Sequence, residues 1–213
     1  QLINSDTEAV LAKGLCERIG AAGSVLKHTP AGGDKVEIES PMPNHTQAIQ
    51  LVINALTDAN HGVVKSLDEI DAVGHRIVHG GEKFASSTII TDEVLAAIEE
   101  CNDLAPLHNP ANLIGINACK EIMPNVPMVA VFDTAFHQTM PPEAYMYGLS
   151  YDMYEEYGIR RYGMHGTSHR YVSGEMIKLL DMPEENTKIV TCHLGNGSSI
   201  TAVDGGKSVD TSM

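Results

Sequence analysis

Residues 126–138 of the chain read VPMVAVFDTAFHQ, an apolar run that ends at an acidic residue. The β-branched run from Val126 to Phe132 predicts a buried strand. Asp133 then falls at the carboxyl end of that strand, which is where ligands bind in open α/β sheets. The same aspartate also fits a strand exit or a helix cap, so both interpretations stay open at this point.

Other segments around this strand alternate between helical and extended patterns, which indicates an α/β fold. Apolar periodicity and capping residues predict helices at 44–59, 91–101 and 167–180. A further helix opens at Asn109-Pro110, with Asn109 as its N-cap and Pro110 in its first position. Extended patterns predict strands at 71–79, 188–194 and 199–204 and a β-hairpin at 24–40. Residues 8–19 fit a helix or a strand.

The two ends and the middle of the chain suggest how its domains are arranged. Most of the tyrosines lie between Pro141 and Tyr162, a mixed loop-and-helix stretch in which we expect a domain boundary. The chain begins with Gln1 rather than with methionine and stops at Met213 in a strand-rich region. We therefore expect both ends to be truncated.

Charge and cysteine content limit the classes of function. The formal net charge is −14 over 213 residues, which argues against a nucleic-acid or anionic-membrane partner, because both need a basic face. The apolar runs are too short to span a bilayer, and no signal peptide is evident. None of the four cysteines forms a C-x-x-C pair. We expect buried free thiols in a reducing compartment, the cytoplasm.

Arg76 stands in the segment GHRIVHGGEKF at residues 74–84. An arginine inside a strand is costly unless it is paired, and its planar guanidinium grips a carboxylate or a phosphate through two parallel bonds. Gly80-Gly81 then allows a sharp turn or a close approach of the backbone to a ligand. The alternative is an edge-strand arginine in a surface salt bridge.

Two further segments place histidines at predicted helix starts. His108 precedes the helix that opens at Asn109, where backbone N–H groups favour anions. The segment RRYGMHGTSH at residues 160–169 is denser in functional groups, and its glycines suggest a strained presentation of His165. Zinc binding by His165 and His169 is not favoured, because the glutamate of H-E-x-x-H is absent.

The glycine-rich loop HLGNGSS at residues 193–199 lies between two predicted strands. Successive backbone N–H groups in such a loop can cradle phosphate oxygens. The loop has neither the lysine of a Walker A motif nor the spacing of G-x-G-x-x-G. Asn196-Gly197 is also a strong hairpin signal, which is compatible with a phosphate-binding loop.

Together and in this order, these motifs closely resemble the acetokinase family, which belongs to the superfamily of acetate and sugar kinases, Hsp70 and actin. The resemblance runs through essentially the whole chain. It implies a ribonuclease H-like, actin-like ATPase fold, with residues 1–145 as a first, acyl-substrate domain and residues 146–213 as the start of a nucleotide-binding domain. It also implies reversible transfer of the γ-phosphoryl group of ATP to acetate, giving acetyl phosphate and ADP, with Mg²⁺ or Mn²⁺ and in a homodimer.

The resemblance assigns roles to single residues. Arg76 matches the arginine that binds the acetate carboxylate, and His165 matches the histidine that contacts the transferring phosphoryl group. Asp133 matches an essential acidic residue, which we expect to orient Arg76 or the metal shell rather than to transfer a proton. The ATP phosphates would lie against His193, Leu194, Gly195, Asn196 and Gly197. The wall of the acyl pocket would hold Val78, Leu107, His108 and Met164.

The same resemblance indicates what lies outside the chain. Metal ligands are expected before Gln1 and after Met213, so no metal ligand is assigned here and the chain is expected to be inactive alone. Met164 stands where phenylalanine is familiar, so a propionate or butyrate kinase is an alternative. A non-catalytic ATP-binding module of the superfamily is another alternative, against which Arg76 and His165 argue.

Overall fold

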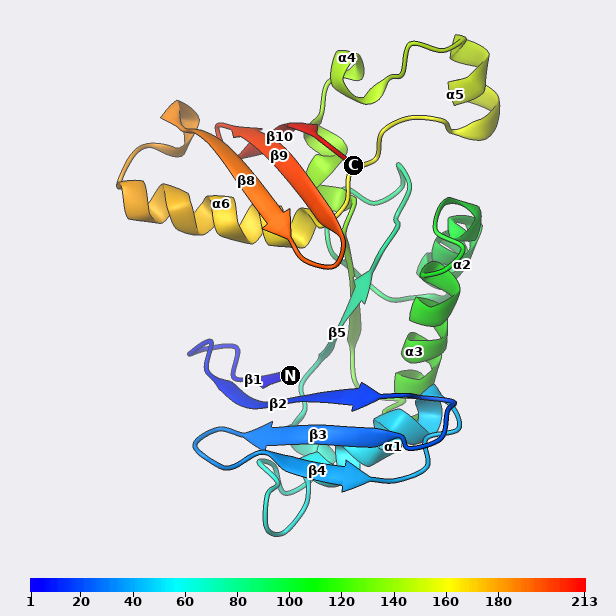
Figure 1. The fold of residues 1–213 in the computed structure, drawn as a ribbon, viewed down its shortest axis with the longest axis vertical. Helices are drawn as coiled ribbons and strands as arrows, with labels where there is room; N and C mark the ends of the chain where they lie inside the picture. Colours follow the sequence, from blue (N-terminus) through cyan, green and yellow to red (C-terminus); the bar gives the residue numbers. More distant parts are fainter. The chain divides into compact units, whose positions relative to one another are not determined.

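The computed structural model describes all residues from Gln1 to Met213 and divides into two compact units. The first unit consists of Gln1–Val73 and Ile114–Pro127, and the second of Gly74–Leu113 and Met128–Met213. Figure 1 follows the chain through these units by colour. None of the helices has both the length and the apolar character that crossing a membrane requires. The expected domain boundary at 145–146 lies inside the second unit, and it stays a prediction about the longer family fold.

The first unit is built on an antiparallel sheet in the order β1-β2-β3-β4. Its strands are β1 (Leu2–Ile3), β2 (Val10–Glu17), β3 (Val25–Pro30) and β4 (Val36–Glu39). The helix α1 (His45–Leu56) contacts β3, and the side chain of Asn44 caps its start by accepting the N–H of Gln47. Buried Leu26, Ala48 and Ile53 form part of the core between sheet and helix.

Two sequence-based expectations are decided in this unit. The hairpin predicted for residues 24–40 is confirmed as β3 and β4. Residues 8–19, which fit a helix or a strand by sequence, form the strand β2, which pairs with β3 along most of its length.

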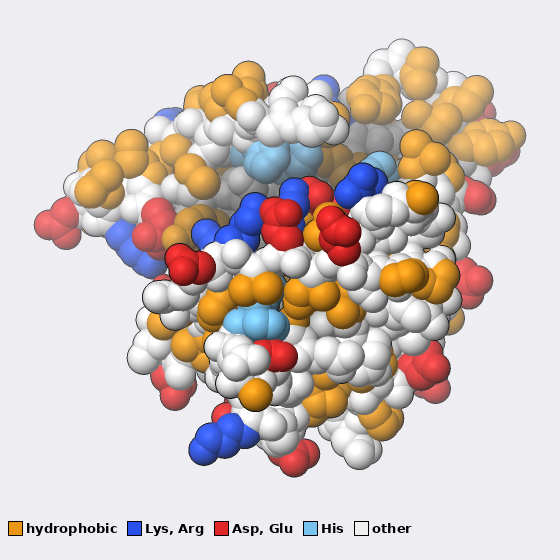
Figure 2. Space-filling view, turned by 60° about the horizontal axis from the view of Figure 1, so that its bottom comes forward, with side chains coloured by type: hydrophobic (Ala, Val, Ile, Leu, Met, Phe, Trp, Pro, Cys, Tyr) orange, Lys and Arg blue, Asp and Glu red, His pale blue; other side chains and the backbone are white.

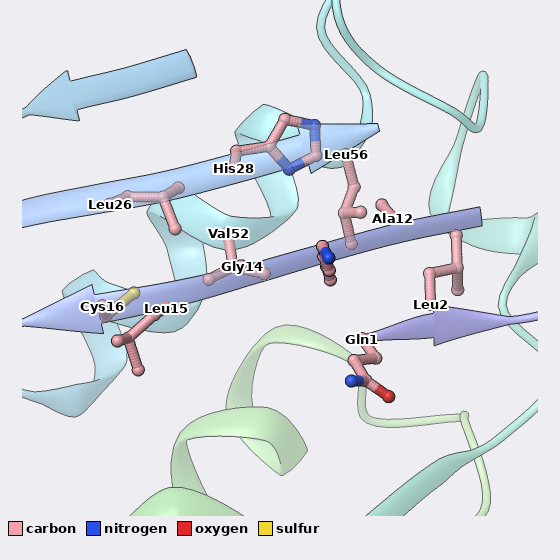
Figure 3. Close-up of a pocket in the computed structure, with 11 residues that line it drawn as sticks. Gln1, Leu2, Ala12, Gly14, Leu15, Cys16, Leu26, His28, Val52 and Leu56 are labelled. Carbon is pink, nitrogen blue, oxygen red and sulfur yellow. The ribbon is translucent and has the colours of Figure 1, made fainter. Parts of the chain in front are cut away.

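A small cavity of about 140 Å³ lies between this sheet and α1. Figure 3 shows its mainly apolar lining, to which His28 also belongs. Nε2 of His28 lies 2.9 Å from the carbonyl oxygen of His61.

The second unit contains two further sheets. The first has the strand order β5-β7-β6, with β5 at Val73–Ile77, β6 at Thr88–Ile89 and β7 at Met128–Phe132. The N–H of Asp133 donates to the carbonyl oxygen of Ile77, so β5 and β7 end side by side. The helices α2 (Asp92–Glu100) and α3 (Asn109–Ile122) follow in sequence and match the predicted helices, and α3 continues into the first unit.

The second sheet of this unit is antiparallel, in the order β10-β9-β8. Its strands are β8 (Lys188–Leu194), β9 (Ser198–Asp204) and β10 (Lys207–Thr211). The helix α6 (Gly166–Leu180) packs against β8 and against the 3-10 turn η3 (Ala135–Thr139), and Figure 1 shows it lying along the sheet. The short helices α4 (Pro142–Tyr145) and α5 (Tyr151–Tyr157) occupy the mixed stretch predicted before α6.

The cysteines correct one expectation. All four are free thiols, as expected, but only Cys101 and Cys119 are buried. Cys192 is exposed on β8, and Cys16 is partly exposed on β2. Val190 and Leu194, two residues before and after Cys192 on β8, are exposed as well, so this face of the strand is open, which the apolar composition of the strand did not reveal.

Candidate active site in the second unit

Arg76 and Asp133 form a two-pronged ion pair at the ends of β5 and β7. The Nε atom of Arg76 lies 3.0 Å from Oδ1 of Asp133, and Nη2 lies 2.6 Å from Oδ2. The aspartate side chain is only 3% exposed, whereas the arginine side chain is 65% exposed. The buried carboxylate therefore grips one edge of the guanidinium and leaves its remaining N–H groups free to meet an anion.

The backbone of Asp133 connects this pair to the start of α6. The N–H of Gly166 donates to the carbonyl oxygen of Asp133 at 2.8 Å. A Cβ atom on Gly166 would lie 2.3 Å from that same oxygen, so only glycine permits this approach. The strand end that carries Asp133 and the helix start that carries His165 are thus held in direct contact.

His165 stands immediately before α6 in a left-handed backbone conformation, with φ 58° and ψ 24°. This conformation is uncommon for a residue other than glycine, in line with the strained presentation predicted from the sequence. Its Nδ1 atom lies 2.9 Å from Oγ of Ser199, and its ring stacks on that of His193 with centroids 4.1 Å apart. Nδ1 of His193 lies 2.9 Å from Oγ of Ser168.

More histidines lie behind this stacked pair. His169 bonds through Nδ1 to Oγ1 of Thr191 and through Nε2 to Oγ of Ser199, both at 2.7 Å. The ring of His137 lies edge-on to that of His169, with centroids 5.7 Å apart. His137 bonds to the carbonyl oxygen of Met164 at 3.0 Å, which supports the residue just before His165.

Most of the predicted site residues line a single cavity of about 750 Å³ in the second unit. They come from β5, the loop before α3, the end of β7, the start of α6 and the β8–β9 turn: Arg76, Val78, Leu107, His108, Asp133, Met164, His165, His193, Asn196 and Gly197. Leu194 and Gly195 do not line it, and the N–H of Gly195 donates to the carbonyl oxygen of Gly197 within the turn. The cavity also touches Leu104, Ala105, Pro106 and Met213, which were not assigned.

Asn109 corrects the predicted N-cap. The helix α3 begins at Asn109 itself, one residue earlier than a cap at this position requires. Oδ1 of Asn109 accepts the N–H of His79 at 3.1 Å, and its Nδ2 donates to the carbonyl oxygens of His79 and Ile98. Because Asn109 is fully buried, these bonds clamp the backbone that follows β5, close to Arg76.

The two arginines before His165 stay out of the cavity. Arg160 is buried, pairs with Glu82 and lies 3.7 Å from the centroid of the Tyr145 ring. Arg161 pairs with Asp210. The functional groups that crowd residues 160–169 therefore divide into structural arginines and cavity-lining residues, which the sequence alone did not separate.

Titration behaviour follows from these surroundings. The hydrogen bonds and charge of Asp133 raise the pKa of Arg76, so its guanidinium stays charged. Burial, followed by the neighbouring His193, lowers the pKa of His165. Burial lowers the pKa of His169 to about 4. At neutral pH the cavity therefore combines the charged guanidinium of Arg76 with the neutral imidazole of His165, which can donate one hydrogen bond.

The polarity of the cavity differs from that of the chain as a whole. Figure 2 shows acidic and basic side chains intermingled over one face, with hydrophobic side chains in separate patches. The cavity has only one acidic side chain, Asp133, and both of its oxygens bond to Arg76. No group of three or more His, Cys, Asp or Glu side chains is placed to hold a metal ion. The residues present thus suit an anion and do not by themselves form a metal site.

Comparison with known proteins identifies the family of this arrangement. The chain matches the Acetokinase family model over residues 1–213. It belongs to the acetokinase family. The chain is 65% identical to the acetate kinase of Desulfitobacterium hafniense (strain DSM 10664 / DCB-2), covering 100% of this chain and 53% of that protein. It is 67% identical to the acetate kinase of Lachnoclostridium phytofermentans, covering 100% of this chain and 54% of that protein.

Solved structures of an acetate kinase and of a propionate kinase share the fold. The crystal structure of Porphyromonas gingivalis acetate kinase matches with a TM-score of 0.94 at 51% identity, over 99% of this chain and 53% of that one. A propionate kinase from Francisella tularensis matches with a TM-score of 0.91 at 42% identity, over 99% and 53% of the two chains. These likenesses confirm the predicted α/β fold of the actin-like ATPase kind. The chain spans about half the length of the curated relatives it matches.

Proposed function

We propose that the protein containing this chain is an acetate kinase, which reversibly transfers the γ-phosphoryl group of ATP to acetate. One observation carries the proposal. The Asp133-bound guanidinium of Arg76 lines the same cavity as His165 and the turn residues Asn196 and Gly197. A carboxylate-binding group and a phosphate-binding loop in one cavity are what such a transfer needs.

The acceptor would be held by the attraction between its carboxylate and the guanidinium of Arg76. Arg76 offers its free N–H groups to the acetate carboxylate, while Asp133 holds the guanidinium in a fixed orientation. The carboxylate is already a nucleophile, so the reaction needs no strong general base. We therefore propose that Asp133 orients the guanidinium of Arg76. The reaction needs no proton transfer by Asp133.

In the transfer itself, an acetate oxygen attacks the γ-phosphorus of ATP, and the bond from that phosphorus to the bridging oxygen of ADP breaks. Phosphoryl transfer relies on positioning and on electrostatic stabilisation of the equatorial oxygens. His165 would donate a hydrogen bond to one of these oxygens from Nε2, and the Asn196–Gly197 turn would hold the phosphates of the nucleotide. A single preorganised donor of this kind typically contributes on the order of 100- to 1000-fold in rate.

The metal requirement is proposed from the family and not from this chain. Mg²⁺ or Mn²⁺, when bound, would neutralise the phosphate charges of ATP. Because the oxygens of Asp133 are engaged by Arg76, this chain supplies no evident set of ligands for such an ion, and no step is assigned to it. A cytoplasmic location and a homodimer remain predictions, as does the inactivity of residues 1–213 alone.

Propionate or butyrate is a second candidate acceptor, and two features of the cavity wall favour keeping it. Met164 is a flexible side chain that adapts to ligands of different size. Leu107 is 85% exposed, so it closes the cavity only loosely in this chain. Initial rates with acetate, propionate and butyrate would decide the acceptor, and acetate is expected to give the highest kcat/KM.

Phosphorus NMR tests the proposed reaction. The protein expressed from its complete gene, incubated with ATP, Mg²⁺ and acetate, is expected to give ADP and acetyl phosphate in equal amounts. Residues 1–213 alone are expected to give neither. Binding of ATP without formation of ADP or acyl phosphate would instead support a non-catalytic ATP-binding module of the superfamily.

A further inference from the structure

A continuous line of side chains runs from the interior of the second unit to the cavity. Oγ1 of Thr191 lies 2.7 Å from Nδ1 of His169, and Nε2 of His169 lies 2.7 Å from Oγ of Ser199. Oγ of Ser199 in turn lies 2.9 Å from Nδ1 of His165. Three elements supply these residues: β8 carries Thr191, β9 carries Ser199 and α6 carries His169.

The proton count along this line allows three arrangements. Each hydroxyl has one hydrogen to donate and two lone pairs that accept, and each neutral imidazole has one N–H. In the first, His169 donates from Nε2 to Ser199, Ser199 donates to Nδ1 of His165, and the ring proton of His165 sits on Nε2. In the second every bond is reversed, and in the third Ser199 accepts from both histidines; in each of these two, Nε2 of His165 carries a bare lone pair.

The position of Nε2 decides which arrangement can meet an anion. A Cβ atom on Gly197 would lie 3.2 Å from Nε2 of His165, so this nitrogen faces the β8–β9 turn at the cavity. A lone pair there would repel a phosphoryl oxygen, whereas an N–H would bond to it. Only the arrangement in which Ser199 donates to His165 is compatible with the proposed transfer.

We propose that Ser199 is a positioning residue that fixes His165 in the Nε2–H tautomer, with His169 and Thr191 setting the direction in which Ser199 donates. This inference rests on the proposed function and adds to it a group that does not touch the substrate. Ser199 does not line the cavity, and neither does His169.

Burial protects the hydrogen bonds of this line from solvent. Ser199 is 2% exposed and His169 is 1% exposed, so water does not compete for their bonds. The burial that lowers the pKa of His169 also keeps it neutral at pH 7, so that it donates from one nitrogen only. Stacking against His193 fixes the plane of the His165 ring.

Two variants separate this role from a merely structural one. Ser199→Ala removes the hydroxyl, and Ser199→Thr restores it. Ser150→Ala is the control, since Ser150 is an exposed serine just before α5 and does not line the cavity. In the protein from the complete gene, Ser199→Ala is expected to lower kcat roughly 10- to 100-fold with little change in either KM, as losses of groups that orient a functional side chain do. Ser199→Thr is expected to recover most of that loss, and Ser150→Ala to leave kcat unchanged.

Nitrogen-15 NMR of histidine-labelled protein reads the tautomer directly and does not depend on activity. Wild-type His165 is expected to be protonated at Nε2, and Ser199→Ala to shift it towards a mixture of tautomers. Protonation of wild-type His165 at Nδ1, or an unchanged tautomer in Ser199→Ala, would overturn the inference. A wild-type protein that makes no acyl phosphate yet shows the expected tautomers would overturn the proposed function alone.

Discussion

The backbone N–H of Gly166 donates to the carbonyl oxygen of Asp133 at 2.8 Å. This one bond joins the end of β7, which holds Arg76 through the Asp133 side chain, to the start of α6, which presents His165. Arg76, the proposed carboxylate-binding residue, and His165, the proposed phosphoryl-binding residue, are therefore held relative to each other through a backbone hydrogen bond.

Gly166→Ala is expected to disturb both sites together, because its Cβ would lie 2.3 Å from the Asp133 carbonyl oxygen. Backbone must then shift, and we expect a lower melting temperature and a loss of activity of at least roughly 10-fold. Gly174→Ala in the same helix is the matched control, since nothing lies within 4 Å of its Cβ. That change is expected to stabilise the protein by up to about 1 kcal/mol through helix propensity. Equal effects of the two changes on activity would contradict the account.

Arg76 and Asp133 are expected to act as one unit. In a double-mutant cycle with Arg76→Lys and Asp133→Asn, the double variant should lose little more kcat/KM for acetate than either single variant. The coupling free energy is expected to be on the order of 1 to 3 kcal/mol, typical of residues in direct contact. Strictly additive losses would show that Asp133 has a role of its own, separate from holding the guanidinium.

His165→Ala is expected to lower kcat on the order of 100- to 1000-fold while the KM values for acetate and ATP change little. The reason is that a donor to the equatorial oxygens contributes most in the transition state. His45→Ala, which alters a histidine in α1 of the first unit, is the control and should keep wild-type kcat. A large rise in KM with unchanged kcat would assign His165 to ground-state binding instead.

Stability is expected to fall as the pH drops from about 6.5 to about 4. Burial lowers the pKa of His79 and of His169 to about 4. In the unfolded chain these groups titrate near 6.5, so between the two values the unfolded state binds more protons and is favoured. Each contributes at most about 3 kcal/mol, present in full above pH 6.5 and lost as the pH falls through 4.

Urea unfolding at pH 7.5, 5.5 and 4.5 measures this dependence. His79→Gln provides the comparison, because carboxylates also titrate towards the acid end of the range. The difference in the free energy of unfolding between wild type and the variant is expected to shrink as the pH falls. A difference that is constant over the three pH values would show that His79 does not take part.

Much of the fold and of the candidate site could be predicted from the sequence, because the residues with functional side chains stand at the ends of strongly patterned helices and strands. The run before Asp133 predicted a buried strand, and the strand end then predicted where the carboxylate would lie. Residues 8–19 stayed open because helical and strand periodicity fit them about equally. Pairing with β3, a contact between segments distant in sequence, settles the question.

Other features could not be predicted from local pattern. Asn109 looked like a helix cap, but tertiary contacts turn its side chain to the backbone of His79. Ser199 looked like an ordinary strand residue, and only the fold brings it between His165 and His169. Leu194 and Gly195 belong to the same loop motif as Gly197, yet neither of them lines the cavity. Such assignments depend on which side chains meet across elements.

Trapping of the acyl phosphate with hydroxylamine tests the central claim most directly. The protein from the complete gene, given ATP, Mg²⁺ and acetate, should form acetyl hydroxamate at a rate that saturates with acetate. Arg76→Ala should reduce kcat/KM for acetate by at least roughly 10-fold, because it removes charged hydrogen bonds to the carboxylate. Arg161→Ala, which alters an arginine outside the cavity, should not. Hydroxamate formation by Arg76→Ala at the wild-type rate over all acetate concentrations would contradict the account.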